Sequence, residues 1–165
     1  KVRINPLAFL RDKGKASILW AMIGLVLTSF FIVAALHAFG IHLFSTWNFP
    51  TPYLALGVIL SLLGAGIMVL AHHQMGTNWR IGLEKDHQVN LVARGIFRYS
   101  RNPIYLGLIL MGFGIFLVIQ DLASLILSIF TSYFFFEIIL SEEKFLEKKF
   151  KGEYKRYKKK VRRFF

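Results

Sequence analysis

The sequence predicts an all-α integral membrane protein with about four transmembrane helices, a cytoplasmic loop and an amphipathic C-terminal helix. Four apolar stretches, at residues 17–40, 52–71, 103–120 and 122–140, each approach the roughly 20 residues that cross a bilayer. All 21 lysines and arginines lie outside them, in segments 1–15, 80–101 and 144–163. Because about half of the 165 residues are apolar spans, we expect a single domain over residues 1–165.

The distribution of charge predicts the orientation. Lysine and arginine are enriched in cytoplasmic loops, so both termini and the loop at 72–102 are expected in the cytoplasm. The turns at 41–51 and 120–121 are then expected outside. A net charge of +12 in such a protein favours anionic lipid headgroups as partners and not nucleic acid. The absence of cysteine excludes disulfides, thiolate metal sites and a cysteine nucleophile.

The first two apolar stretches have separate signals. The first is too long for the core of a signal peptide and follows many residues, so we expect a retained span. The second carries Gly57, Ser61 and Ala65 at four-residue spacing. Small residues at this spacing let a second helix approach closely, which predicts a packing face.

The last two apolar stretches are expected to form a tight helical hairpin, because only Gln120 and Asp121 separate them. The hairpin returns Asn102 and Glu142 to the same membrane face. From residue 141 the chain predicts an amphipathic helix that lies on the membrane or folds over the loop. Its apolar and aromatic residues recur every three or four positions: Leu146, Phe150, Tyr154, Tyr157, Val161 and Phe164.

The polar residues at this face have structural and functional interpretations. Asn102 and Pro103 suit the N-cap and first position of a helix, and such a start also offers free N–H groups to an anionic ligand. Glu142 and Glu143 either complement a helix dipole or belong to a site. Glu137 lies within an apolar run, where either a structural ion pair or a functional role is expected, with Arg98 or Arg101 as partner.

Other common sites are not predicted. His72, His73 and His87 lack the carboxylate or cysteine neighbours that complete a metal site, so we expect no metal. No phosphate-binding glycine pattern and no nucleophile turn occur in the sequence.

Several motifs together resemble the integral-membrane methyltransferases, which include isoprenylcysteine carboxyl methyltransferases and phospholipid N-methyltransferases. These motifs read WRIG at 79–82, LVARGIFRY at 91–99 and RNPIYLG at 101–107. The acidic pair at 142–143, followed by the aromatic pattern of the tail, resembles the C-terminal signature of these enzymes. The resemblance covers about half of the chain, from residue 74 to the end.

The resemblance implies methyl transfer from S-adenosylmethionine to a lipophilic small molecule or lipid at the cytoplasmic face, within one membrane methyltransferase-like domain. It assigns no catalytic base, and the sequence does not predict an oligomeric state. By position, it implies that the methyl donor contacts Leu91, Val92, Phe97, Arg101, Asn102, Pro103, Tyr105, Glu142 and Glu143. Aromatic faces favour a sulfonium cation, a carboxylate suits its ammonium group, and an arginine or helix start suits its carboxylate.

Two departures bear on the acceptor. Asn102 stands where prenylcysteine enzymes have histidine, and no arginine shortly precedes the acidic pair. Both departures argue against a prenylcysteine carboxylate as acceptor, and Asn102-Pro103 is closer to phospholipid methyltransferases. Two alternatives remain open: a membrane reductase of the sterol-reductase type that uses NADPH, and a non-enzymatic basic membrane scaffold.

Overall fold

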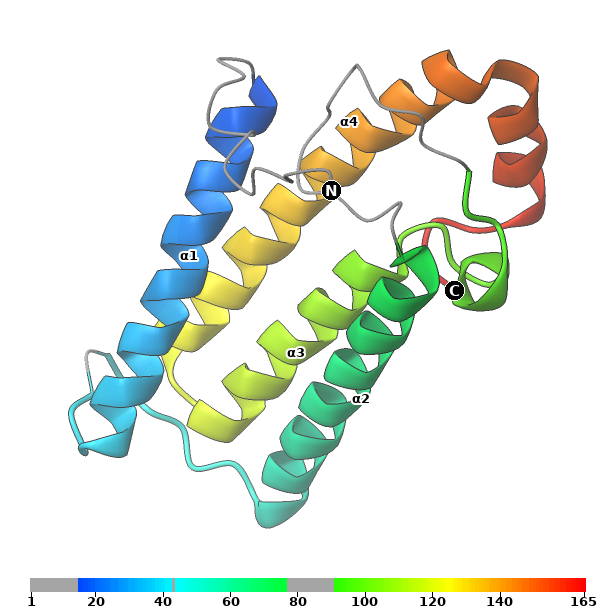
Figure 1. Cartoon of the computed structure of the whole chain (residues 1–165). Helices are drawn as coiled ribbons and strands as arrows, with labels where there is room; N and C mark the ends of the chain where they lie inside the picture. The colour runs from blue at the N-terminus through cyan, green and yellow to red at the C-terminus, as the bar shows by residue number, and fades with distance from the viewer. Residues whose placement is uncertain (1–14, 43, 77–90) are drawn as a thin grey trace.

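The computed structural model describes residues 15–42, 44–76 and 91–165, with side chains from residue 21 onward. The described chain contains four α-helices and one short 3-10 helix (Figure 1). These are α1 (Lys15–Ala38), α2 (Thr51–Met75), η3 (Gly95–Arg98), α3 (Pro103–Ile119) and α4 (Leu122–Lys160). Two isolated β-bridges occur within these ranges, but no strand. The predicted all-α class is confirmed.

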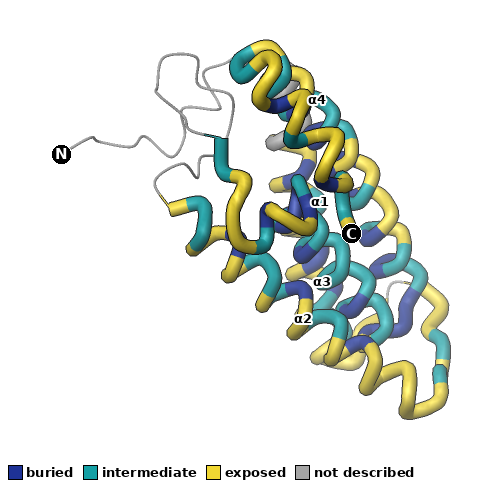
Figure 2. The backbone as a smooth tube through the Cα atoms, turned by 90° about the vertical axis from the view of Figure 1, so that its right-hand side faces the viewer, coloured by how far each residue is buried: buried dark blue, intermediate teal, exposed yellow. Residues whose placement is uncertain are grey.

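Each of the four predicted apolar stretches forms a helix. Helices α1, α2 and α4 are long and apolar enough to span a membrane, and α3 is an apolar helix of 17 residues, near the lower limit for a span. Large apolar side chains such as Phe31 and Leu62 are exposed on the outer faces of the bundle. Figure 2 shows that buried residues gather where helices meet and exposed ones face outward. This distribution suits helices surrounded by lipid, and the chain is an integral membrane protein.

The helices lie in the order α1, α4, α3, α2 across the molecule (Figure 1). Helix α3 packs most extensively on α2, and α4 packs between α1 and α3. The main buried cluster joins three helices at the end of the bundle where α3 begins. Its members are Ile23 of α1, Tyr105 of α3, and Phe134, Phe135, Ile138 and Ile139 of α4.

Glycines allow α2 and α3 to approach closely. Gly64 and Gly107 face each other, so that a Cβ added to either would overlap the other residue's carbonyl oxygen. One and two turns towards the other end of the pair, Ser61 and Gly57 meet Gly114 in the same way. The predicted packing face on the second apolar stretch is therefore confirmed at Gly57 and Ser61, with Gly64 as its most crowded position.

The loop before α2 packs over the α3–α4 turn at the opposite end of the bundle. Gln120, in the left-handed region (φ 57°), accepts the N–H of Trp47 at its backbone carbonyl (2.7 Å) and that of Phe49 at its side chain (2.8 Å). Asp121 caps α4 through its carboxylate, which accepts the N–H of Ser124 at 2.6 Å. The predicted hairpin thus forms. Its turn is held by the loop before α2 through Gln120 and by the first turn of α4 through Asp121.

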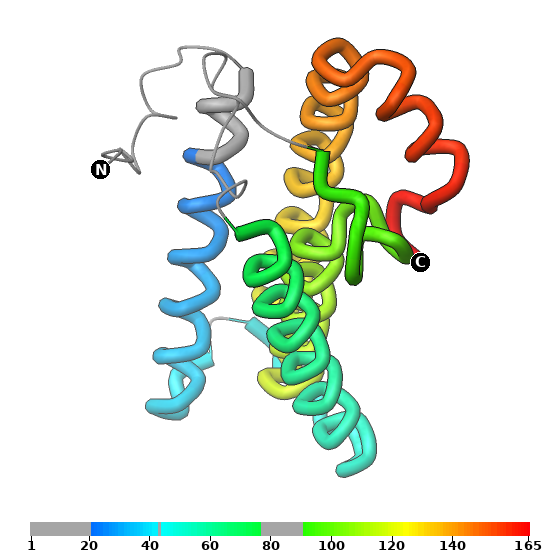
Figure 3. Tube along the Cα trace, turned by 45° about the vertical axis from the view of Figure 1, so that its right-hand side comes forward, coloured from blue at the N-terminus to red at the C-terminus, as the bar shows by residue number. Residues whose placement is uncertain are grey.

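The tail is helical, as predicted, and the structure shows how it connects to the last apolar stretch. Helix α4 continues without interruption from the apolar part, which ends near residue 140, into the charged tail. The helical path breaks only at Lys151, whose φ of 45° and ψ of −116° are non-helical. The remaining turns, residues 152–160, are called the tail helix below; they double back towards η3 (Figure 3).

We predict that Gly64→Ala destabilises the protein, whereas Gly66→Ala does not. Alanine is favoured over glycine in a helix by about 1 kcal/mol, so the exposed Gly66, with open space around its Cα, should tolerate it. At Gly64 the new methyl group overlaps the α3 backbone, and overpacking of this kind costs about 1–3 kcal/mol. Reversible unfolding in mixed micelles measures both. Equal stability of the two variants would contradict the close α2–α3 contact.

Candidate functional site

The segment before α3 is held by the end of α2. Gly95 has a φ of +60°, and a Cβ there would overlap the side chain of Gln74. The Gln74 side-chain oxygen accepts the N–H of Ile96 at 2.7 Å. This contact fixes η3 and turns Phe97 inward, where it is buried. Of the predicted loop at 72–102, residues 77–90, including the WRIG motif and His87, lie outside the described residues.

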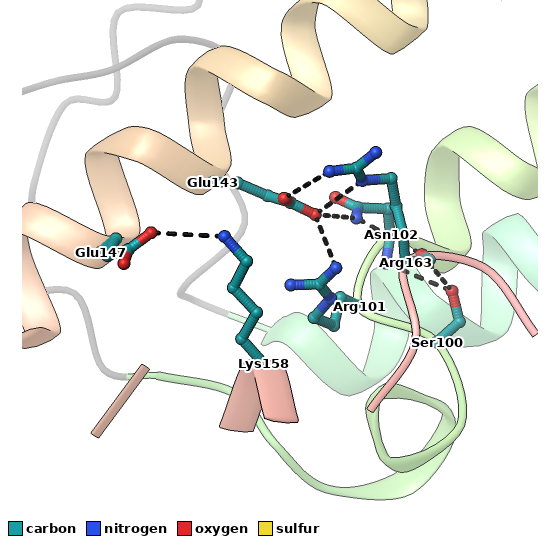
Figure 4. Close-up of polar contacts among 7 residues, drawn as sticks. All are labelled: Ser100, Arg101, Asn102, Glu143, Glu147, Lys158 and Arg163. Atoms are coloured by element: carbon teal, nitrogen blue, oxygen red, sulfur yellow. Dashed lines mark hydrogen bonds and ion pairs between the residues drawn. The ribbon is translucent and has the colours of Figure 1, made fainter. Parts of the chain in front are cut away.

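Glu143 joins three sequence-distant segments (Figure 4). Arg163 donates two hydrogen bonds to its carboxylate, from Nε at 3.1 Å and from Nη2 at 3.0 Å. Arg101 Nη2 lies 3.3 Å from Glu143 Oε1, and Asn102 Nδ2 donates to the same oxygen at 3.3 Å. Burial opposes ionisation of Glu143, but the hydrogen bonds from Arg163 and the charge of Arg101 outweigh it and lower its pKa. The carboxylate therefore stays ionised.

The last residues of the chain lie alongside the segment that precedes α3. The Arg101 N–H donates to the carbonyl of Arg162 at 3.0 Å, and the Ser100 hydroxyl donates to the carbonyl of Arg163 at 3.1 Å. Further back, the Tyr157 hydroxyl donates to the carbonyl of Phe97 at 2.7 Å. The break at Lys151 makes these contacts possible because it reverses the direction of the tail. The end of the tail thus packs behind the segment that carries Phe97, Arg101 and Asn102.

Glu142, adjacent in sequence, has a different environment. The Tyr105 hydroxyl donates to Glu142 Oε1 at 2.7 Å, which connects the first turn of α3 to α4. No arginine or lysine of the described chain pairs with this carboxylate. Burial raises the pKa of Glu142 to about 7, and the hydrogen bond from Tyr105 opposes the rise only in part. A cation placed beside Glu142 would favour its charged form and lower this pKa.

A cavity of about 540 Å³ lies between α2, α3 and α4 at this end of the bundle. It combines an apolar surface with a few polar groups, the usual composition of small-molecule sites. Its lining residues are Met68, Val69, His72 and Met75 of α2; Phe97, Arg101 and Asn102; Pro103, Ile104, Tyr105 and Leu108 of α3; and Glu142 and Leu146 of α4.

The structure brings together most of the predicted site residues. Those that line the cavity are Phe97, Arg101, Asn102, Pro103, Tyr105 and Glu142. Glu143 lies behind the cavity, enclosed by Arg101, Asn102 and Arg163. Leu91 and Val92 are half-buried and are not among the residues that line the cavity. Asn102 does occupy the N-cap position of α3, but its side chain makes no cap hydrogen bond and binds Glu143 instead.

One predicted pairing is corrected. Arg101, expected as a partner of Glu137, pairs with Glu143, because α3 begins beside the first turn of the tail and not beside the deeper apolar turn of α4.

Two groups of residues at the site were not predicted from the sequence. The α2 wall, Met68, His72 and Met75, follows helical spacing and could be recognised only once α2 was known to pack on α3. Arg163 lies in a run of basic residues that resembles a solvated surface. Nothing in that run distinguishes the one arginine that turns inward.

We predict that Arg163→Met costs about 2 kcal/mol of stability and that Lys158→Met costs less than about 0.5 kcal/mol. Loss of Arg163 leaves the buried Glu143 carboxylate with weaker compensation, whereas Lys158 makes only an exposed pair with Glu147 at 3.4 Å. Chemical unfolding in detergent compares the two. Similar losses for both variants would show that the Glu143 network does not organise this end of the protein.

Comparison with known proteins places the chain in a family. The sequence profile of the family described as Phospholipid methyltransferase matches residues 52–153, more than half of the chain. The chain is also 35% identical over 109 residues to the Protein-S-isoprenylcysteine O-methyltransferase of Saccharomyces cerevisiae (strain ATCC 204508 / S288c). That match covers 64% of this chain and 46% of the yeast protein, so the chain spans about half the length of that relative. The chain belongs to the phospholipid methyltransferase family of integral membrane proteins.

Proposed function

We propose that this protein transfers a methyl group from S-adenosylmethionine to a lipophilic acceptor at the cytoplasmic face of the membrane, as one domain over residues 1–165. The observation that carries the proposal is the cavity where α3 begins. It combines a carboxylate that pairs with no arginine or lysine of the described chain, a buried arginine and two aromatic rings. Family membership and the name of the yeast relative support methyl transfer over the reductase and scaffold alternatives. The described cations at residues 94–101 and in the tail lie at the cavity end, which supports a cytoplasmic site.

The polar groups of the cavity match the ends of the methyl donor. Glu142 would accept its ammonium group, with Tyr105 holding the carboxylate in place. Arg101 would hold its carboxylate together with the start of α3, next to Asn102 and Pro103. The Arg101 side chain is 8% exposed, and its Nε and Nη1 have no hydrogen-bond partner within the described chain. A buried guanidinium with two nitrogen atoms free to donate is suited to an anionic ligand group.

The aromatic residues would accommodate the sulfonium. Phe97 and Tyr105 both line the cavity, and aromatic faces attract a cation within about 6 Å. Leu91 and Val92, which precede η3, are proposed as further apolar contacts. Glu143 is proposed to act indirectly, by holding Arg101 and Asn102 in position. S-adenosylmethionine would supply an activated methyl group, which passes to a nucleophilic atom of the acceptor and leaves a neutral thioether.

The apolar side of the cavity suits the acceptor. Met68 and Val69 of α2 and Leu108 of α3 line it, on helices whose outer faces are apolar and exposed. A lipid or small amphiphile could therefore place its polar end at the cavity while its chain stays in hydrocarbon. In such a displacement the protein mainly positions the two reactants and excludes water, and we assign no catalytic base.

Glu142→Gln should weaken S-adenosylmethionine binding at least about tenfold, because a hydrogen bond to a charged group contributes roughly 1.5–3 kcal/mol. Glu147→Gln is the matched control, since Glu147 lies one turn further along α4 and pairs with Lys158 outside the cavity. Calorimetry on the purified chain measures both affinities. Absence of binding by folded wild type, or an equal loss in the control, would overturn the proposal.

Donor affinity should fall as the pH is lowered below about 7 and level off above it. Below its raised pKa, Glu142 is protonated in the empty protein, so an ammonium group must displace a proton to bind, at a cost of up to about tenfold in affinity per pH unit. The raised pKa of Glu142 also makes the free energy of unfolding depend on pH, in the opposite direction. The folded state holds the proton of Glu142 more tightly than the unfolded state does, so this contribution to stability is lost as the pH rises from 4.5 to about 7. Titrations of donor binding across this pH range, with Glu142→Gln as reference, test the expected change in affinity. An identical pH profile in the variant would exclude Glu142 as the titrating group.

A further inference from the structure

Two sequence-distant segments form an exposed basic surface beside the site. Arg94 and Arg98 flank η3, and Lys159, Lys160 and Arg162 lie at the end of the tail; all five are exposed. We call these five residues the basic face. It is separate from the cavity, since none of the five lines it.

Direct contacts hold the two segments together. Tyr157 and Phe97 are joined by the hydrogen bond described above. Lys159 and Lys160 follow Tyr157 by two and three residues, and Arg98 directly follows Phe97. A parallel bridge pairs Ser100 with Arg162. Figure 3 shows the end of the tail running beside the segment that precedes α3. The five cations therefore occupy one end of the molecule.

The basic face has little local compensation. In the described tail, Glu142 and Glu143 are engaged at the site and Glu147 pairs with Lys158. The remaining carboxylate, Glu153, is exposed and lies next to the break at Lys151, away from the end of the tail. None of the five cations forms an ion pair within the described chain. A surface of this kind attracts a polyanionic partner.

The position of the basic face relative to α3 identifies that partner. Helix α3 begins at Pro103, three residues beyond Ser100, so the Ser100–Arg162 bridge lies where this apolar helix leaves the hydrocarbon. Tyr99 is 67% exposed and Phe165 is 61% exposed on either side of the bridge. Exposed aromatic residues among cations are typical of the headgroup level of a membrane. Lipid headgroups, and not nucleic acid, surround a protein at this depth of the membrane.

We propose that the basic face binds the headgroups of anionic phospholipids in the adjacent leaflet, and that this binding holds the tail helix against η3. The proposal goes beyond methyl transfer and does not depend on it. Each basic residue near an anionic surface strengthens binding about fivefold. Lipid bound across both segments would stabilise the contact between the tail helix and the segment that carries Phe97.

The test is a titration of short-chain phosphatidylglycerol into the full chain in a neutral detergent, without methyl donor. The readout is amide hydrogen exchange of residues 152–162. We expect exchange to slow in wild type with phosphatidylglycerol and not with phosphatidylcholine. Removing one cation from each segment, in Arg98→Gln/Lys160→Gln, should weaken the effect about 25-fold.

The matched control is Lys155→Gln/Arg156→Gln, which removes the same charge from the beginning of the tail helix, near the break at Lys151. It should respond as wild type does. An equal loss in the control would show that net charge alone is responsible, and the same slowing by free glycerol phosphate would show that the surface does not select lipid. Either result, or no effect in wild type, overturns the proposal. Exchange in α2 and α3 verifies folding, and Lys159→Gln/Arg162→Gln replaces the test variant if it fails.

Discussion

The buried carboxylate of Glu143 is the interaction on which the polar end of this protein depends. An ionised carboxylate is costly to bury, and here two arginines and an amide compensate for it. Because these partners come from the segment before α3 and from the end of the chain, one group fixes the start of α3 and the path of the tail. Removal of any one partner therefore affects the position of the others.

The neighbouring carboxylate, Glu142, has a different environment because its side chain points in another direction from α4. Adjacent residues on α4 point about 100° apart, so Glu143 faces its arginine partners while Glu142 faces the cavity and Tyr105. A single sequence feature, the acidic pair, thus provides one structural anchor and one candidate ligand-binding group. The glycine contact between α2 and α3 complements this arrangement. It brings the last turns of α2 close enough to α3 to form the apolar wall of the cavity.

Much of this arrangement could be predicted from residues. The absence of lysine and arginine from four long apolar stretches predicted the helices. The two-residue connection at Gln120 and Asp121 predicted that Asn102 and the acidic pair meet at one end. The continuation of α4 into the tail could not be predicted, because the change from apolar to charged composition resembles a boundary although helical propensity persists across it. The reversal at Lys151 is marked only by the adjacent Gly152, and a single glycine within a helical pattern does not by itself predict a reversal. The inward position of Arg163 depends on that reversal, so it could not be predicted from the sequence either.

Photolabelling tests most directly whether the junction of α2, α3 and α4 holds the methyl donor. The folded chain would be irradiated with radiolabelled S-adenosylmethionine, digested and mapped. We expect label in the peptides that contain residues 97–108 and 142–146, and we expect excess S-adenosylhomocysteine to remove it. Label confined to other peptides, such as the loop at 44–50 at the opposite end of the bundle, or label that the competitor does not displace, would contradict it.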